Sequence, residues 1–466
     1  MKKRHSTLQL FYTILVVIST GLSLTSCGED RTHEFDELVS PNPWIYNIMI
    51  DHYLYYQDIE QPEDADYFSE SPDFFTTLLS DQDGKDGSTY SYVQGNTVTK
   101  ATISDLSYGW ELKYIRMNSE TTNVAVQVEF VYPSSPAALA GLKRGDIFIK
   151  RDGEQYTQSN YTTFATETDA ATLTLLDDTT TITLPAATNA TYDPLVAHSI
   201  IEQNGLKVGY VCYSKFIVDS GDSSDEYINN LINTIGEMAS QNIDEFILDL
   251  RYNRGGDIVA SQKLSTILLP KETLGKELFH LQYNGKQENN TIQYLSDKSF
   301  LNGQSNLEIS RIYIITSGYT ASASELVINS IIPYFGRDNV ILVGQTTFGK
   351  HVAMAGYTNP DSPEYTYWPV VADVYNSEGT ADYDNGFIPD FDLTETTSTT
   401  LQDLGSSQEW YVKNILSLID TGAIIDTDTN TDSSESEGSN PLANQSIYPN
   451  PINAKALPIK IGLSKD

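Results

Sequence analysis

Short apolar runs alternate with amphipathic stretches through the second half of the chain. The runs lie at 208–213 (VGYVCY), 245–250 (EFILDL), 311–316 (RIYIIT) and 340–344 (VILVG). Continuous apolar runs of this length are typical of strands buried on both faces of a parallel sheet. Between the first two runs, one helix face is marked at the i, i+3, i+4 and i+7 positions by Ile228, Leu231, Ile232 and Ile235. The pattern predicts repeated βαβ units and an α/β core.

The first half of the chain carries two other patterns. Between 42 and 92, apolar and aromatic residues recur at helical spacing, at Ile45, Ile48, Met49, His52, Tyr53 and Tyr56. This stripe predicts a small helical module with a packed core. From 101 to 190, partial alternation at 123–131, 172–176 and 179–184 predicts short strands, with a short helix that begins at Pro136 and ends at Gly141.

The N-terminus has the organisation of a secretory signal. Lys2, Lys3 and Arg4 precede an uncharged, largely apolar run from Leu8 to Leu24. The following Leu24-Thr-Ser-Cys27-Gly28 resembles the lipobox of bacterial lipoproteins. That resemblance implies removal of residues 1–26, acylation of Cys27 by groups such as palmitate, and attachment to a lipid bilayer of the bacterial cell envelope, facing the periplasm or the cell surface. An ordinary signal peptide with an incidental cysteine is the alternative.

Composition narrows the possible partners. The 466 residues include 63 Asp and Glu against 28 Lys and Arg, a formal net charge of -35. A surface this negative repels phosphate, so nucleic acid is excluded as a partner. The most uniformly acidic stretch is 426–440 (DTDTNTDSSESEGSN), which lacks apolar residues and is expected to be a disordered linker or tail. We therefore divide the chain into five parts. They are the leader (1–26), the N-terminal helical module (27–104), a β-rich domain (105–195), the α/β core (196–420) and an acidic tail (421–466).

Metal and thiol chemistry are not expected. Only two cysteines occur, and Cys212 lies inside an apolar run, as expected of an inert core thiol. Apart from His351, the histidines of the predicted mature chain are scattered and have no paired-ligand spacing: His33, His52, His198 and His280. We expect no metal and no cofactor.

Polar segments follow the apolar runs, at the edge of an α/β sheet where active sites form. After 311–316 comes Ser317-Gly-Tyr-Thr-Ala-Ser-Ala-Ser-Glu325, a small-residue turn that opens a helix; a hydroxyl there is favourably placed for an oxyanion. After 340–344 comes Thr347-Phe-Gly-Lys350, whose lysine could act as a base if removed from water. After 245–250 comes Arg251-Tyr-Asn-Arg-Gly-Gly256, a glycine pair whose N–H groups could bind an oxyanion.

Together with Gly386-Phe-Ile-Pro-Asp390, these motifs resemble the C-terminal processing peptidases, serine peptidases with a PDZ domain. The resemblance implies a ClpP/crotonase-like α/β core with an inserted PDZ-like domain and a small N-terminal helical module. It implies Ser322 as nucleophile and Lys350 as general base. The N–H of Ala323, with that of Gly255 or Gly256, would hold the oxyanion.

The segment 135–148 and the turn Ser107-Tyr108-Gly109-Trp110 resemble parts of a PDZ domain. In that resemblance, Tyr108, Gly109 and Trp110 belong to the loop that captures the C-terminus of a peptide substrate. A β-rich spacer without a ligand is the alternative.

The chain departs from the family pattern near the lysine. Ser322 and Lys350 are 28 positions apart, a few more than expected, with an extra turn suggested at 331–335. Met354 stands where the family often has a Gln that orients the lysine, and His351 replaces a glycine. A thioether is a weak acceptor, so the lysine's positioning is in question. Ser324 is the alternative nucleophile.

Two other functions remain open. A catalytically weak or inactive scaffold could bind peptide C-termini through the PDZ-like domain, as Met354 hints. A crotonase-like acyl-CoA enzyme is disfavoured, because acyl-CoA is not expected outside the cytoplasm.

Overall fold

The computed structural model describes residues 41–96, 106–118, 120–221, 223–286, 289–395 and 401–425, together with short strands at 447–448 and 459–461. The predicted leader 1–26, the predicted acylation site Cys27, His33 and the acidic segment 426–440 lie outside the described residues. Among the described residues, no helix has the length and apolar character needed to cross a membrane.

A six-stranded sheet in the order β19-β14-β13-β10-β9-β8 forms the centre of the molecule. Its strands are β8 (Leu195–Gln203), β9 (Leu206–Tyr213), β10 (Glu245–Asp249), β13 (Ile312–Thr316), β14 (Val340–Gly344) and β19 (Phe391–Asp392). All neighbours pair in parallel except β8 and β9. The four apolar runs read from the sequence are therefore adjacent strands, and the prediction of a parallel α/β core is confirmed.

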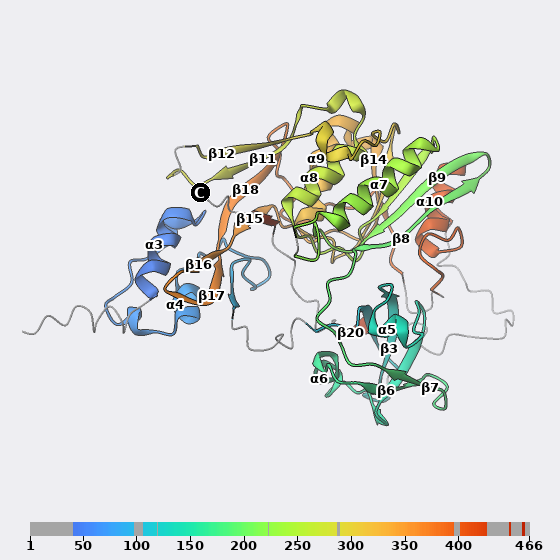
Figure 1. Cartoon of the computed structure of the whole chain (residues 1–466), viewed down its shortest axis with the longest axis horizontal. Coiled ribbons are helices and arrows are strands. Elements are labelled where there is room, and N and C mark those ends of the chain that lie inside the picture. The colour runs from blue at the N-terminus through green and yellow to red at the C-terminus, as the bar shows by residue number, and fades with distance from the viewer. Residues whose placement is uncertain are drawn as a thin grey trace, which may run out of the picture.

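Helices cover both faces of this sheet because successive strand residues point in opposite directions. Val211, Leu248 and Ile314 point toward α7 (Glu226–Ser240), α8 (Ile258–Leu268) and α9 (Ala323–Phe335). Their neighbours Tyr210 and Ile247 pack with α10 (Trp410–Thr421) on the other face. The predicted helix face of Ile228, Leu231, Ile232 and Ile235 is fully buried in α7. Figure 1 shows α7, α8 and α9 in front of the sheet.

A second sheet extends the core toward the N-terminal module, in the order β12-β11-β18-β15-β21. It contains β11 (Glu277–Tyr283), β12 (Thr291–Leu295), β15 (Val352–Ala355), β18 (Val370–Asn376) and β21 (Ile459–Ile461). A small sheet beside it joins β1 (Tyr92–Gly95), β17 (Ser362–Trp368) and β16 (Tyr357–Asn359). The first strand of this sheet thus comes from the N-terminal part of the chain and the other two from beyond residue 350.

The N-terminal module contains α3 (Asn42–His52) and α4 (Ser71–Thr77), with 3₁₀ turns at Tyr56–Asp58 and Asp66–Phe68. Ile45, Met49 and Tyr53 are fully buried against Val352 and Met354 of the core. The helical module is confirmed, but its predicted stripe ends early: α3 stops at His52, and Tyr56 lies in the separate 3₁₀ turn. Figure 1 shows this blue module lying against the orange strands β15 to β18.

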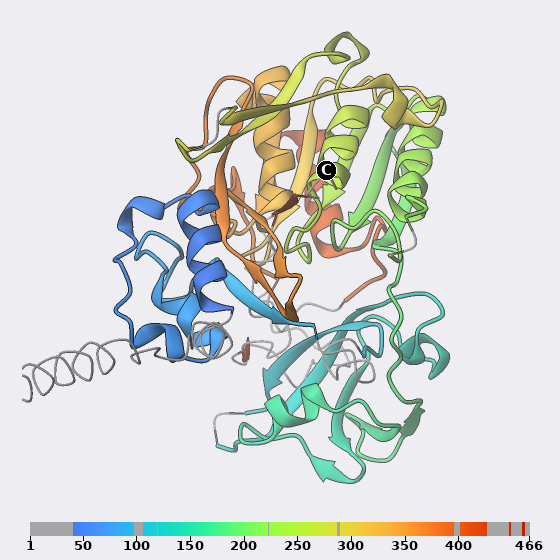
Figure 2. The same cartoon turned by 60° about the vertical axis from the view of Figure 1, so that its left-hand side comes forward.

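Strands from residues 110–184, together with β20 from the C-terminal part of the chain, form a separate antiparallel sheet in the order β20-β2-β3-β4-β6-β7. Its strands are β2 (Trp110–Arg116), β3 (Val124–Val131), β4 (Ile147–Arg151), β6 (Ala171–Leu175), β7 (Thr181–Leu184) and β20 (Ile447–Tyr448), and β5 (Glu154–Gln155) pairs with β4. Two short helices, α5 (Pro136–Leu139) and α6 (Tyr161–Thr166), accompany it. As predicted, Pro136 opens a helix and Gly141 follows its end, with φ +83°. Figure 2 shows this body below the core.

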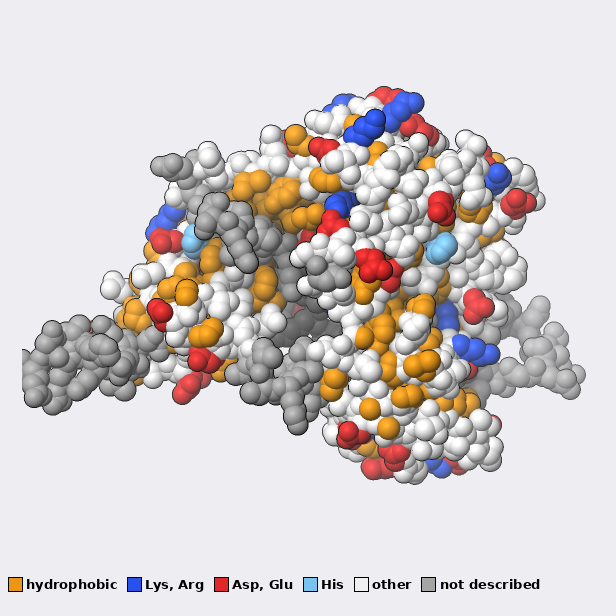
Figure 3. Space-filling model, viewed as in Figure 1, with side chains coloured by type: hydrophobic (Ala, Val, Ile, Leu, Met, Phe, Trp, Pro, Cys, Tyr) orange, Lys and Arg blue, Asp and Glu red, His pale blue; other side chains and the backbone are white. Residues whose placement is uncertain are grey.

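Side-chain charge is spread over the surface rather than gathered at one place. On the face drawn in Figure 3, Asp and Glu side chains are scattered over the core, the N-terminal module and the β2–β7 body. The high acid content therefore does not mark a single acidic binding face on this side of the molecule.

Candidate active site

Ser322 stands immediately before α9, at the carboxyl end of strand β13. Its backbone has φ 60° and ψ -115°, outside the region that non-glycine residues ordinarily occupy. Such strain persists only where surrounding structure enforces it, and it clusters at functional residues. A strained serine on a strand-to-helix turn presents its hydroxyl at the sheet edge, an arrangement that α/β-hydrolases use for their nucleophile.

The two candidate serines have different surroundings. Ser322 Oγ is buried and makes no hydrogen bond with a described residue, although it faces the N–H of Glu325 in the capping box of α9. Ser324 Oγ instead donates a hydrogen bond to the carbonyl of Asn253, at 3.0 Å. The Ser324 hydroxyl therefore has a structural partner, whereas the Ser322 hydroxyl is left for another group.

The glycine pair lies directly against Ser322. A Cβ at Gly255 would fall 2.7 Å from Ser322 Cβ and 2.9 Å from the Ala323 nitrogen, so only glycine fits this approach. The Gly255 N–H already donates to Asn253 Oδ1 at 2.9 Å. No described residue accepts a hydrogen bond from the N–H of Gly256 or Ala323. Of the two predicted oxyanion pairs, this arrangement favours Gly256 with Ala323.

Lys350 is buried beside this turn, with 2% of its surface exposed. Its Nζ donates to Met354 Sδ at 3.4 Å and lies 5.0 Å from the centre of the Tyr90 ring. Burial lowers the pKa of Lys350 to about 8, against the attraction of Asp83 and Glu325 for the ammonium form. The amine can therefore lose its proton near neutral pH, which a general base requires.

Ser322 and Lys350 are not hydrogen-bonded to each other in this structure. The hydroxyl has no partner, and the amine's hydrogen bond goes to Met354 Sδ. Met354, predicted to stand at the lysine-orienting position, does contact the lysine, although through a weak acceptor.

Glu325 fixes the two candidate catalytic segments relative to each other. Its buried carboxylate accepts the N–H of Ser322 at 2.8 Å, that of Gly349 at 2.6 Å and that of Lys350 at 2.8 Å. The Thr347 hydroxyl also donates to it, at 2.6 Å. Burial raises the pKa of Glu325 in spite of these donors. The sequence marked Glu325 only as part of a motif.

The motif at 386–390 packs against the segment 347–350 that carries the lysine. Gly386 packs on the Thr347 carbonyl, where a Cβ would approach to 2.0 Å. The Phe387 N–H donates to Thr347 Oγ1 at 2.7 Å. This explains physically why a motif so far along the chain accompanies the lysine motif.

The sequence did not predict the structural role of Asn253. Its side chain donates to the Tyr213 carbonyl at 2.9 Å while its Oδ1 holds the Gly255 N–H. Its own carbonyl accepts from Ala321 N–H and Ser324 Oγ. In the sequence, its position two residues before the glycine pair was the feature that could have indicated this role.

Other singled-out residues lie elsewhere. His351 Nδ1 lies 2.9 Å from Asp384 Oδ1, and its Nε2 lies 3.7 Å from Asp373 Oδ1. Cys212 is fully buried in β9, as expected of a core thiol, and burial raises its pKa. His52 stacks on Tyr357, with ring centres 4.9 Å apart. The extra residues 331–335 continue α9 to Phe335.

The predicted peptide-binding loop precedes β2, far from Ser322 in sequence. The Tyr108 side chain is buried and packs against Trp110. Gly109 has φ +72°, and its N–H donates to Ser107 Oγ at 2.9 Å. The loop therefore has the conformation that glycine permits. A second N–H group of the turn, that of Ser107, donates to the Thr188 carbonyl at 2.9 Å.

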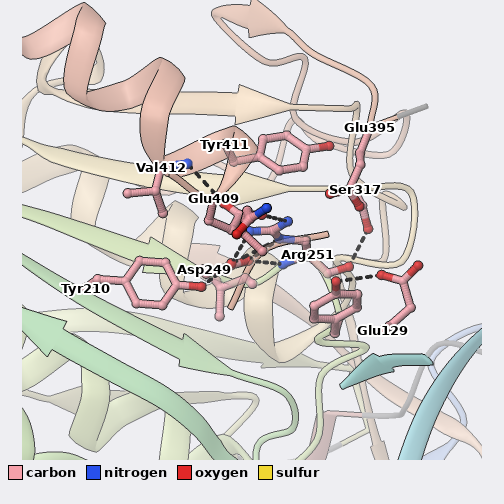
Figure 4. Close-up of polar contacts among 12 residues, drawn as sticks. Glu129, Tyr210, Asp249, Arg251, Ser317, Glu395, Glu409, Tyr411 and Val412 are labelled. Atoms are coloured by element: carbon pink, nitrogen blue, oxygen red, sulfur yellow. Dashed lines mark hydrogen bonds and ion pairs between the residues drawn. The ribbon is translucent and has the colours of Figure 1, made fainter. Parts of the chain in front are cut away.

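A buried charge network lies behind the glycine segment (Figure 4). Arg251 donates to Asp249 at 2.6 Å and to Glu409 at 2.8 Å. Arg144, from the β2–β7 body, donates to the Tyr252 hydroxyl at 2.8 Å. Ser317 Oγ donates to the Arg251 carbonyl at 2.5 Å. The network joins the β2–β7 body to the start of the segment that carries the glycine pair.

Comparison with known proteins agrees with this architecture. The profile of peptidase family S41 matches residues 207–393, and that of the peptidase S41 N-terminal domain matches residues 40–92. A solved structure from Bacteroides fragilis, of a protein assigned to the S41 proteases, is 28% identical with a TM-score of 0.72, over 81% of this chain and 97% of that one.

Two curated relatives are carboxyl-terminal-processing proteases. The one from Picosynechococcus is 26% identical over 53% of this chain and 55% of its own length. The one from Synechocystis is 25% identical over 51% of each. The chain thus spans about half the length of the curated relatives it matches.

The described residues have a mixed α/β fold with several sheets, as in the proteins that these profiles describe. The chain belongs to peptidase family S41, whose two profiles match the core and the N-terminal module.

Proposed function

We propose that this protein is a serine endopeptidase that cleaves proteins or peptides near their C-termini through Ser322 and Lys350. The observation that carries the proposal is the strained Ser322 beside Gly255 and Ala323, tied through Glu325 to a buried lysine. In this proposal the nucleophile, the oxyanion donors and the base come from segments that follow neighbouring strands of one sheet.

In the proposed reaction, neutral Lys350 takes the proton from Ser322 Oγ as the oxygen attacks the peptide carbonyl. The N–H groups of Gly256 and Ala323 stabilise the oxyanion. The C–N bond then breaks, Lys350 returns the proton to the leaving amine, and water hydrolyses the acyl-enzyme by the same proton path.

The β2 edge is proposed to bind the substrate's C-terminal segment as an added strand. Strand β20 supports this: Tyr448 pairs with Tyr114 and Ile447 with Ile115, in antiparallel register. A segment in this register runs toward the loop before Trp110 as its residue number rises. A bound peptide would point its carboxyl end toward that PDZ-like loop.

We further propose attachment to the cell envelope through acylated Cys27. The lipobox-like sequence at 24–28 supports it. Metabolic labelling with a fatty-acid analogue tests it, and loss of label in Cys27→Ser is the expected result. Labelling that survives this substitution would contradict the assignment.

Peptide hydrolysis by Ser322→Ala tests the catalytic assignment. We expect hydrolysis to fall by roughly 10³-fold or more, without loss of the fold. Ser324→Ala is the matched control and should stay active, because its hydroxyl only donates to Asn253. Unchanged hydrolysis in Ser322→Ala would disprove the assignment.

The second candidate function is a scaffold that binds peptide C-termini without cleaving them. It is favoured by Met354 at the lysine and by the missing Ser322–Lys350 hydrogen bond. Labelling of Ser322 by a fluorophosphonate, together with a proteolysis assay at pH 7 to 9, separates the two. Peptide binding with neither labelling nor turnover would favour the scaffold.

A further inference from the structure

The lysine site is completed by a loop from the N-terminal module, more than 250 positions away in sequence. Residues 83–91 of this loop contact the segment 348–350 at several points. Lys85 Nζ donates to the Phe348 carbonyl at 2.6 Å, and Tyr90 OH donates to the Gly349 carbonyl at 3.4 Å. The rings of Tyr90 and Phe348 meet edge to face, with centres 6.4 Å apart.

The loop is itself held rigidly by Asp83. This carboxylate is 2% exposed, and its Oδ1 accepts the N–H of Tyr90 at 3.1 Å and that of Ser91 at 3.0 Å. Its Oδ2 accepts the Tyr53 hydroxyl at 2.8 Å. Ser91 Oγ accepts the Val370 N–H at 2.9 Å. The position of the Tyr90 ring over the lysine is therefore determined by packing and hydrogen bonds.

The chemistry of the contact differs from an ordinary lysine site. Lys350 Nζ contacts Met354 Sδ and lies over the face of the Tyr90 ring, 5.0 Å from its centre. A ring face attracts a cation less than a carboxylate or amide oxygen does, and it excludes water. The titratable groups that act on Lys350 are Asp83 from the loop and Glu325 from α9, with Tyr90 against it.

We propose that Tyr90 is a positioning residue for Lys350, so that the N-terminal module forms part of the active site. This inference rests on the proposed function, because it assigns a role toward the proposed general base. Tyr90 covers the amine with the face of its ring instead of holding it by a hydrogen bond. The module is then required for a competent base as well as for stability.

The test compares Tyr90→Phe, Tyr90→Leu and Tyr90→Ala with the wild type. Tyr92→Ala is the matched control, since the Tyr92 ring stacks on Trp368 instead. Removing the ring admits water, and relief of burial favours the ammonium form. We expect Tyr90→Ala to move the acidic limb of the kcat/KM profile about one pH unit toward alkaline pH.

At pH 7.5 the same variant should lose about tenfold or more in kcat with little change in KM. Tyr90→Phe, which keeps the ring, should stay within about threefold of wild type. Tyr90→Leu, which keeps bulk without a ring face, separates exclusion of water from attraction to the ring. A wild-type profile in both Tyr90→Ala and Tyr90→Leu would overturn the proposal.

A second measurement does not depend on activity. In the Ser322→Ala background, the chemical shift of ¹³C-labelled lysine Cε reports the titration of Lys350, assigned with Lys350→Arg. A shifted titration in Tyr90→Ala supports the positioning role even if the wild type proves inactive. An unshifted titration in a folded Tyr90→Ala protein overturns it. Failure of the inference is thus separated from failure of the proposed peptidase function.

Discussion

Lys350 carries an energetic cost that makes its role measurable without a substrate. Burial lowers its pKa from 10.5 to about 8, so the unfolded chain binds more protons than the native protein between these two values. Stability contributed by this group therefore rises with pH across that window, and the cost is fully present below pH 8. An amine placed in this way is poorly explained by stability alone.

Lys350→Met should stabilise the protein at pH 7 by about 2 kcal/mol, because it removes the buried amine. It should also abolish the part of the stability rise between pH 8 and 10.5 that Lys350 causes. Urea unfolding at several pH values measures both effects, with the exposed Lys271→Met as control. A variant less stable than wild type at pH 7 would contradict this account.

The elements that bring the site together are the first turn of α9 and the segment 347–350, joined by Glu325. One buried carboxylate accepts three backbone N–H groups and one hydroxyl. Removing it leaves those donors without partners in a place that water does not reach. The serine and lysine segments would then separate.

Glu325→Ala should therefore lower the free energy of unfolding by roughly 3 kcal/mol and remove peptide hydrolysis. Ser324→Ala, one position earlier in the same turn, loses a single hydrogen bond and should cost about 1 kcal/mol. Chemical unfolding and a peptide assay on both variants check this. Equal losses in the two variants would argue against the linking role of Glu325.

The core elements could be predicted because a short, continuous stretch of sequence specifies each one. Buried parallel strands and the α7 face appear as apolar runs and helical periodicity, and Ser322 and Lys350 appear in motifs that follow strands. The end of α3 could not be predicted from the sequence. The Leu54 N–H donates to the carbonyl of Val370, a residue far along the chain, instead of continuing the helix. Tyr90 was missed for the same reason: its contacts are made with Gly349, 259 positions away, and with the lysine that follows.

At the scale of the whole molecule, buried charges connect the β2–β7 body to the α/β core. Lys113, on the β2 edge strand, pairs with Glu129 at 2.6 Å. Burial raises the pKa of Glu129, but Lys113 and Arg144 outweigh it and lower the pKa to about 2. The Tyr252 hydroxyl donates to the same carboxylate at 2.6 Å. The proposed peptide-binding strand is thus linked through few contacts to the residues that precede the glycine pair.

That strand is occupied in this structure by the chain itself. β20 fills the open edge of β2, and the Ile447 side chain is 48% exposed. A tethered strand competes with free peptide at an effective concentration of about 1 mM. Removing it should therefore expose the edge to substrate.

We expect deletion of residues 426–466 to tighten binding of a peptide with a free carboxylate by at least about fivefold. Replacement of 426–440 by a Gly-Ser segment of equal length, which keeps 447–461 and the length of the tether, is the matched control and should leave binding unchanged. Fluorescence anisotropy with Ser322→Ala proteins measures binding without cleavage. If both variants bind the peptide like the full chain, β20 does not compete for the β2 edge, and the peptide binds elsewhere.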